Sequence, residues 1–120
     1  MAAGELRAAV RERDGVAVID LVGDVNASAE EALNDAYARA TASRLGAVAL
    51  NFERADYINS TGIALIVGLL AQARTRGIEV TAFGLSDHYR QIFELTRLDE
   101  AIAIHNTETD SLTAANKEHP

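Results

Sequence analysis

Short aliphatic runs alternate with longer amphipathic stretches along most of this chain. The runs are β-branched or aliphatic, and glycine or charged residues bound them: Val16 to Val22, Ala47 to Phe52, Ile78 to Phe83 and Ala101 to Ile104. Runs of this kind are typical of strands in a sheet, and the run Ala47 to Phe52 suits a strand that is covered on both faces.

The first of these runs follows a turn signal. Asp14-Gly15 separates VAVIDLV from the loosely alternating stretch Glu5 to Arg13, which predicts an N-terminal hairpin. Gly23-Asp24 is expected to break the second strand of this hairpin.

Three amphipathic stretches carry apolar residues at helical spacing and begin with capping signals. The first is expected to run from about Ala29 to Arg44, with Ser28 and Glu31 forming a capping box. The second, Thr61 to Arg76, is apolar on most of its faces, which predicts a helix that is largely buried against a sheet. The third follows Ser86, which is placed to cap it.

A fourth, shorter helix is expected at the C-terminus. Thr107 and Asp110 form a pattern like a capping box, and the helix is predicted to reach about Ala115, with residues 116–120 frayed like the first few residues. Strands and helices alternate after the hairpin. The sequence therefore predicts a single α/β domain over residues 1–120, with about four helices on a mixed, mostly parallel sheet of four to five strands.

The composition mainly excludes certain partners and kinds of site. The 120 residues are 48% apolar and 24% charged, an ordinary globular balance, and the formal net charge is -7 with no strongly basic stretch. Nucleic acid is therefore not an expected partner. The absence of cysteine excludes disulfides and thiolate metal sites. The N-terminus lacks the apolar core of a signal peptide, and Ile63 to Ala71 is too short to cross a membrane, so we expect no membrane partner and a cytoplasmic location.

No pattern in the sequence points to catalysis. His88, His105 and His119 have no metal-ligand spacing, and the chain lacks a P-loop, a GxGxxG fingerprint and a Gly-x-Ser-x-Gly elbow. We therefore expect no catalytic residue, no metal and no cofactor. A hydrolase built on Ser60 would need a histidine within hydrogen-bond reach of its hydroxyl.

Four small residues, Asn59, Ser60, Thr61 and Gly62, stand at the start of the second helix. Capping is worth about 1 kcal/mol and explains one such polar residue. Three in a row before a glycine suggest a backbone that must allow close approach. Ser60 is also expected at the carboxyl end of a strand and the positive end of a helix, where a phosphate is favourably placed. The residues alone support capping and a functional hydroxyl equally.

Taken in chain order, the expected strands and helices resemble the STAS domain of the bacterial anti-sigma factor antagonist family over nearly the whole chain. VIDLVGDVNASAEEAL matches the family's apolar strand, Gly-Glu/Asp-Leu/Val-Asp and helix. ADYINSTGIALIVGLLAQARTRG is similar to its core signature, Asp-Ser-Ser/Thr-Gly before an apolar helix. VTAFGLSDHYRQIFELTRLDEAIAIH matches the strand, glycine, helix and final strand that follow. The resemblance implies the STAS fold.

The resemblance also implies that Ser60 is phosphorylated, because Ser60 is the first hydroxyl residue after the family's aspartate position. Thr61 and Gly62 match the next two positions, and Asn59 replaces the aspartate. The amide of Asn59 keeps the shape and the capping ability of the aspartate but loses its charge.

A neighbouring loop is implicated in the same way. In the family, the loop that contains Asp24 and Asn26 lies beside the phosphorylation site and contributes to partner contact, and Asn26 stands where many members have aspartate. The implied partner is a serine kinase of the histidine-kinase-like ATPase fold that doubles as an anti-sigma factor.

The mechanism that the resemblance implies is partner switching. We expect the protein not to be an enzyme and to be a monomer or weak homodimer. The unphosphorylated form binds the kinase and frees the sigma factor, phosphorylation of Ser60 abolishes binding, and a serine phosphatase resets the switch. Asn59 keeps an alternative open: a STAS scaffold or accessory subunit of a signalling (stressosome-like) or transport assembly that is bound but not switched.

Overall fold

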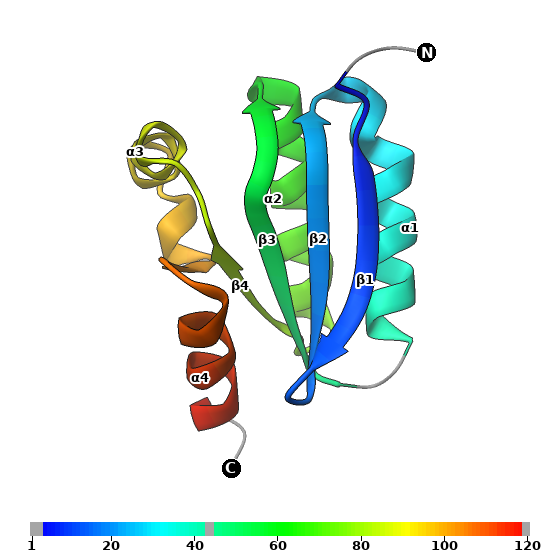
Figure 1. Cartoon of the computed structure of the whole chain (residues 1–120), viewed down its shortest axis with the longest axis vertical. Helices are drawn as coiled ribbons and strands as arrows, with labels where there is room; N and C mark the ends of the chain where they lie inside the picture. The colour runs from blue at the N-terminus through cyan, green and yellow to red at the C-terminus, as the bar shows by residue number, and fades with distance from the viewer. Residues whose placement is uncertain (1–3, 43–44, 119–120) are drawn as a thin grey trace.

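Five strands form one mixed sheet in the computed structural model, which describes residues 4–42 and 45–118 (Figure 1). The strands stand in the sheet in sequence order: β1 (Arg7–Arg13), β2 (Val16–Val25), β3 (Ala47–Ile58), β4 (Glu79–Phe83) and β5 (Ala103–His105). β1 and β2 form the expected antiparallel hairpin, and the other neighbours pair in parallel. The predicted mixed, mostly parallel α/β sheet is confirmed.

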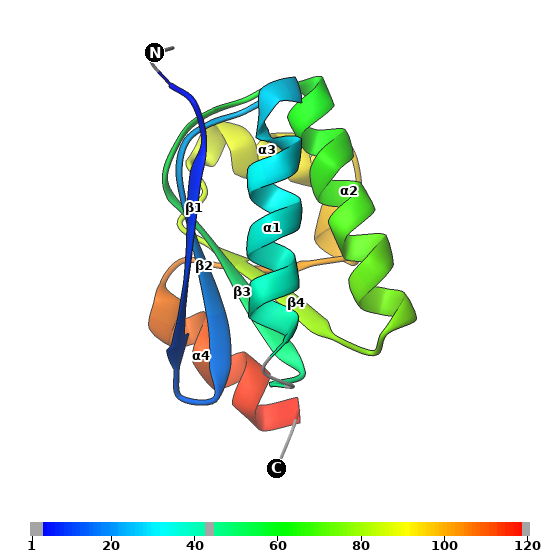
Figure 2. The ribbon, with the colours of Figure 1, turned by 90° about the vertical axis from the view of Figure 1, so that its right-hand side faces the viewer.

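Helices cover both faces of this sheet. They are α1 (Glu30–Thr41), α2 (Ser60–Thr75), α3 (Asp87–Leu95) and α4 (Glu108–Glu118), and two short 3-10 helices, η1 (Ala27–Ala29) and η2 (Leu98–Glu100), complete the order. α1 and α2 lie side by side on one face (Figure 2), while α4 lies on the other and α3 lies beyond β4.

Two apolar clusters explain why the strand-forming runs are continuously apolar. The larger cluster packs α1 and α2 on one face of the sheet and contains Leu21, Leu50 and Ile66. The smaller cluster packs Leu112 of α4 against the opposite face, where Phe83 is fully buried. Central strands are therefore covered on both sides, as the sequence of β3 predicted.

β2 and β3 extend further than expected. The predicted break at Gly23-Asp24 is wrong, because β2 continues to Val25, which pairs with Ile58 of β3. The pairing register shifts on either side of Gly23, whose φ is 113°, so the glycine bends the strand and does not end it. β3 likewise continues past the expected boundary at Glu53-Arg54.

The start of α1 also differs from the prediction. The expected Ser28–Glu31 capping box is wrong: Asn26 caps η1, and its Oδ1 accepts hydrogen bonds from the Ser28 amide at 3.0 Å and the Ser28 hydroxyl at 2.7 Å. α1 follows without a side-chain cap and ends at Thr41. The expected end at Arg44 lies outside the described residues.

The later caps agree with the sequence. Ser86 Oγ accepts from the Tyr89 amide at 3.3 Å, and Thr107 Oγ1 accepts from the Asp110 amide at 3.1 Å. α4 continues to Glu118, beyond the predicted end near Ala115. The fraying expected for the first few residues and for the chain end falls in part on residues 1–3 and 119–120, which lie outside the described residues.

An ion-pair network joins α4 to the hairpin. Arg11 donates to both Asp20 oxygens and both Glu108 oxygens at 2.7–3.0 Å, Arg13 donates to Glu108 at 2.7 Å, and Asn51 donates to Asp20 at 2.8 Å. Hydrogen bonds from Arg11 lower the pKa of Glu108 to about 2, with burial opposing and Arg13 assisting. Burial raises the pKa of Asp20, but the bonds from Arg11 and Asn51 outweigh it and hold that pKa below its usual value.

Candidate functional site

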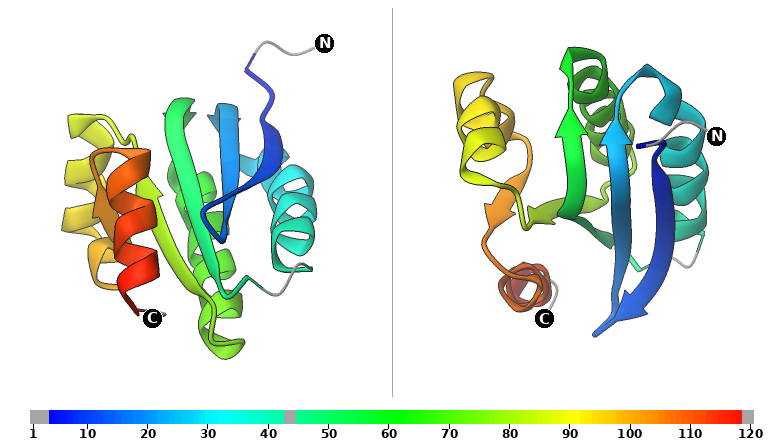
Figure 3. Two further views of the ribbon diagram at one scale, coloured as in Figure 1. Left: turned by 60° about the horizontal axis from the view of Figure 1, so that its bottom comes forward. Right: turned by 45° about the horizontal axis from the view of Figure 1, so that its top comes forward.

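The cluster Asn59 to Gly62 lies at the carboxyl ends of β2 and β3. Asn59 follows the last residue of β3, and Ser60 is the first residue of α2. Figures 1 and 3 show the carboxyl ends of β2 and β3 at the same edge of the sheet. The Asn59 amide donates to the Val25 carbonyl at 3.2 Å, which joins the cluster to the end of β2. The structure thus confirms the placement that the sequence predicted: a strand end that runs into a helix start.

Asn59 is the residue that caps α2. Its backbone is extended, with φ -98° and ψ -178°, and its Oδ1 accepts a hydrogen bond from the Gly62 amide at 2.8 Å. One capping side chain is all that this geometry uses. The capping explanation therefore accounts for Asn59 and leaves the hydroxyls of Ser60 and Thr61 without that role.

Gly62 is required by close packing within the chain. A Cβ at this position would lie 1.9 Å from the Val25 carbonyl oxygen, so any side chain would push the first turn of α2 away from the end of β2. The close approach that the sequence predicted is thus made by the protein's own backbone. Gly62 fixes the position of the Ser60 hydroxyl relative to β2.

Ser60 and Thr61 are exposed, and within the described residues neither hydroxyl has a hydrogen-bond partner. Both residues belong to the first turn of α2, whose amides have no acceptor inside the helix. The positive end of the helix dipole is directed at the same place. An anion attached to Ser60 would therefore meet donors and a favourable field.

Asp24 and Asn26 lie at the same edge of the sheet as Ser60, on either side of Val25. Asp24 is half-buried, and its backbone amide donates to the Gly4 carbonyl at 2.6 Å. Asn26 is also half-buried, and Ser28 occupies its side-chain oxygen. The structure therefore brings both predicted residues beside the cluster, with Asn26 acting as a local cap.

Tyr89 belongs to this region, and the sequence analysis did not single it out. Its hydroxyl oxygen accepts a hydrogen bond from the Ile58 amide at 3.0 Å, so α3 holds the end of β3 immediately before Asn59. An aromatic residue in the first turn of α3 gave no signal of this contact, because the two elements are 31 residues apart along the chain. Tyr57, one residue before Ile58, is 53% exposed and lies on the same edge.

In the part of the chain that the structure describes, no catalytic base is hydrogen-bonded to Ser60. Among the described residues no histidine or carboxylate is hydrogen-bonded to its hydroxyl, and His119 lies outside them. The described ranges also contain no cluster of three or more histidine, aspartate or glutamate side chains that could bind a metal ion. Of the helices that the structure describes, none has the length and apolarity needed to cross a membrane.

The mixed five-stranded sheet, with its strands in sequence order and helices on both faces, defines an α/β domain. The chain belongs to the STAS domain family, whose sequence model matches residues 7–111.

Curated proteins are similar to part of the chain. The anti-sigma-B factor antagonist of Listeria monocytogenes serovar 1/2a is 37% identical over 59 residues, which cover 49% of this chain and 52% of that protein. The chain thus matches about half the length of such curated relatives.

Solved structures match over more of the chain. An anti-sigma factor antagonist from Mycobacterium paratuberculosis superposes with a TM-score of 0.79 at 21% identity, over 91% of this chain and 92% of that one. SpoIIAA in its unphosphorylated form gives a TM-score of 0.68 at 16% identity, over 92% and 97%. The phosphorylated form of the Bacillus protein SpoIIAA gives 0.67 at 19% identity, over 90% and 98%. At these identities the matches establish the fold alone.

Proposed function

We propose that this protein is an anti-sigma factor antagonist that works by partner switching, with Ser60 as its phosphoacceptor. The observation that carries the proposal is the division of roles at the start of α2: Asn59 makes the cap, and the exposed Ser60 hydroxyl has no partner in the described part of the chain. The names of the relatives and the two states in which SpoIIAA has been solved support the same function.

Phosphorylation at Ser60 changes the charge of the surface without disturbing the fold. A phosphate adds about -1.5 to -2 charges at neutral pH and three acceptor oxygens. The free amides and the dipole of α2 stabilise it locally. The same charge repels an acidic patch on the partner or obstructs a close interface, and a difference of about 1.4 kcal/mol between the two states already changes affinity tenfold.

The partner in this proposal is a serine kinase of the histidine-kinase-like ATPase fold that also acts as the anti-sigma factor. It transfers the γ-phosphoryl group of ATP to Ser60 Oγ, its own base takes the hydroxyl proton, and ADP leaves. A serine phosphatase hydrolyses the phosphoserine. Asp24, Asn26, Thr61 and Gly62 form the surroundings that the partner contacts, and the protein itself is not an enzyme but supplies the hydroxyl and the docking surface.

Asn59 is compatible with this function because the cap geometry uses an oxygen that asparagine and aspartate share. The Gly62 amide donates to Oδ1, which is present in both side chains. The substitution therefore removes one negative charge beside Ser60 and keeps the helix start.

Intact-mass analysis tests the proposal directly. The protein is incubated with ATP, Mg²⁺ and each candidate kinase of the same genome, with Ser60→Ala in parallel. One added phosphate on the wild type and none on Ser60→Ala is the expected result. Phosphate that persists in Ser60→Ala would place the acceptor elsewhere and overturn the assignment of Ser60.

A non-switching scaffold is the second candidate, and Asn59 is the observation that favours it. A stable complex with the kinase-like partner, together with no phosphate on the wild type under any kinase, would establish this role. Binding measured before and after incubation with ATP separates the two functions, because only the switch loses affinity.

A further inference from the structure

The outward face of α2 is uncharged over three turns. No charged residue occurs from Ser60 to Ala73, yet Ala64, Val67 and Ala71 are exposed, with 45% of Val67 accessible to solvent. The exposed side of a surface helix is normally charged or polar. At 3.6 residues per turn, Ser60, Val67 and Ala71 fall on one face, so this uncharged face begins at the proposed phosphorylation site.

A groove lies at the other end of this face. It has a volume of about 650 Å³, and α2, the start of β4, η2 and β5 line it. Its larger apolar lining residues are Val67, Leu70, Ile78, Val80, Leu98 and Ile102. Small-molecule and cofactor sites typically have volumes of about 300–1,000 Å³ and predominantly apolar walls. The groove falls within this range.

The shortness of β5 explains why the groove exists. β5 pairs only with residues Thr81 to Phe83, so the first residues of β4 have no neighbouring strand on that side. The gap lies between α2 and η2, and no side chain of the described residues fills it. Val67 and Ala71 belong both to the wall of this groove and to the uncharged face of α2. One uncharged surface therefore leads from Ser60 to the groove, whose wall begins at Val67, about 10 Å along the helix, and includes Ala71, about 16 Å along it, at about 1.5 Å per residue.

The charges in the lining identify the chemistry of the occupant. Asp99, Glu100 and Glu79 line the groove together with one cation, Arg74. Asp99 and Glu100 are exposed on η2, and the exposed Arg97 lies 4.0 Å from Glu100, so Asp99 contributes most to the acidic character of the lining. A fatty-acid carboxylate or a second copy of this chain, whose net charge is -7, would bring more negative charge to this acidic surface. A segment with an apolar face and flanking lysine or arginine residues complements it.

We propose that the groove and the uncharged face of α2 together bind an amphipathic, basic helix of the partner that reads Ser60; this inference rests on the proposed function. Apolar residues of that helix lie against Val67 and the groove, and its lysine or arginine residues face Asp99 and Glu100. The groove and Ser60 lie at opposite ends of this interface. The contact at the groove therefore contributes to the affinity of the unphosphorylated complex, whereas a phosphate on Ser60 weakens the contact at the other end.

Two groove variants with matched controls test the inference. Val67→Gln makes the wall polar and keeps the helix, because glutamine is a better helix former than valine. Its control is Leu95→Gln, since Leu95 is 83% exposed on α3 and does not line the groove. Asp99→Lys/Glu100→Lys reverses the acidic lining. Its control, Glu12→Lys/Asp35→Lys, changes the net charge equally on β1 and α1.

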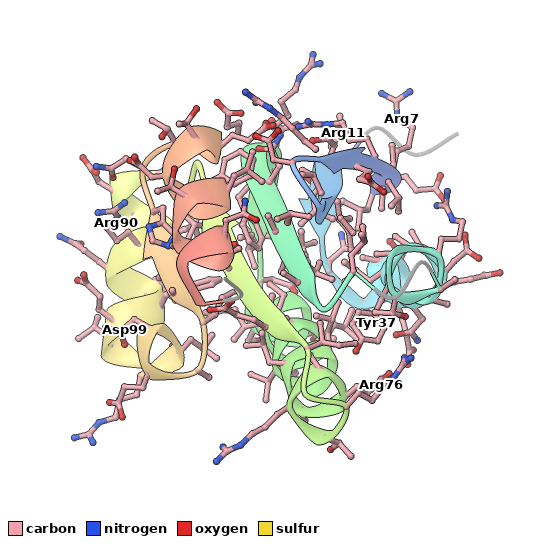
Figure 4. The ribbon with its side chains drawn as sticks, turned by 90° about the horizontal axis from the view of Figure 1, so that it is seen from below. Arg7, Arg11, Tyr37, Arg76, Arg90 and Asp99 are labelled. Carbon is pink, nitrogen blue, oxygen red and sulfur yellow. The ribbon has the colours of Figure 1, made fainter. Side chains whose placement is uncertain are left out.

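The two charge variants probe opposite sides of the molecule. Figure 4 shows Asp99 on the far side from Arg11 of β1, the strand that carries Glu12. The four carboxylates are all exposed, so their reversal is expected to leave the fold intact. Circular dichroism melting curves check this for each variant.

Isothermal titration with the cognate anti-sigma partner, at low and high salt, provides the measurement. We expect both groove variants to weaken binding by about tenfold or more, and both controls to stay within about twofold of wild type. We expect the affinity of the wild type to fall with salt, and the reversed charges should abolish this dependence.

The outcomes separate this inference from the proposed function. Groove variants that bind like wild type, while Ser60→Asp still abolishes binding, would refute the groove interface and leave the switch intact. A wild type that binds no candidate partner would refute both. A dimer in sedimentation that Val67→Gln converts to a monomer would show that the groove holds a second copy and would likewise overturn the proposed occupant.

Discussion

Replacing Asn59 by alanine removes the oxygen that accepts the Gly62 amide hydrogen bond at 2.8 Å. Loss of an N-cap costs about 0.5–2 kcal/mol. Gly62 is buried against the Val25 carbonyl, so water cannot easily take the place of the lost oxygen, and we expect a cost in the upper half of this range, about 1–2 kcal/mol. With an unfolding entropy of about 2.1 cal/mol/K per residue, this cost lowers the Tm by about 4–8 °C.

Replacing Ser60 by alanine provides the comparison for this prediction, because it should leave the Tm almost unchanged. Ser60→Ala removes a hydroxyl that has no partner within the described residues, so its Tm should stay within about 1 °C of wild type. Asn59→Asp keeps the accepting oxygen and adds a charge that the helix dipole favours by about 0.3–1 kcal/mol, so its Tm should equal or exceed that of wild type.

Differential scanning calorimetry and urea denaturation of the three variants provide the assay. An Asn59→Ala variant as stable as wild type would show that Asn59 is not the cap. A Ser60→Ala variant as destabilised as Asn59→Ala would mean that the serine has a structural role, and the argument for a free acceptor hydroxyl would fail with it.

Three further substitutions test the packing beside the site and the ion-pair network that joins α4 to the hairpin. Gly62→Ala should cost about 2–3 kcal/mol in urea denaturation, because its Cβ has no room beside the Val25 carbonyl; an unchanged midpoint would refute this packing. Tyr89→Phe should cost about 1 kcal/mol and speed hydrogen exchange of the Ile58 amide, whereas unchanged exchange would show that α3 does not hold β3. The pKa of Glu108 is lowered from 4.5 to about 2, so its stabilisation is complete above pH 4.5 and is lost as the pH falls toward 2. After discounting for the exposed arginines, this loss amounts to about 1–2 kcal/mol, and Glu108→Gln should remove that part of the acid dependence.

The sequence predicted the order of the elements because the apolar runs and capping residues are local signals. The predicted ends of strands were wrong where pairing between distant segments determines how far a strand extends. β2 and β3 continue to Val25 and Ile58 because each supplies the other's hydrogen bonds, whereas composition alone placed a break at Gly23-Asp24. Similarly, Ser28 and Glu31 had the spacing of a capping box. In the structure, however, the amide and the hydroxyl of Ser28 both donate to the side-chain oxygen of Asn26, two residues earlier.

For the candidate site, too, the position along the chain was predictable from the sequence, whereas contacts between distant segments were not. Asn59 to Gly62 could be placed at a strand end from local pattern and family resemblance. The residues alone supported capping and a functional hydroxyl equally, and the structure assigns the cap to Asn59, while phosphorylation of Ser60 stays a prediction. The groove beside Val67 gave no sequence signal. It depends on how few residues β5 pairs with β4, which no local pattern of apolar residues specifies.

Asn59 also bears on the energetics of the proposed switch. A neighbouring aspartate would share the first-turn amides and the helix dipole with a phosphate on Ser60, and two like charges so close raise the cost of the phosphorylated state. Asparagine accepts the same Gly62 hydrogen bond without a charge. With asparagine, the first turn of α2 would stabilise the phosphate without a competing charge on residue 59, and the proposed step in charge at this helix start is that of the phosphate itself, about -1.5 to -2. The sequence from Ser60 to Ala73 carries no charged side chain, so within this stretch of α2 the phosphate would be the first charge that a partner meets.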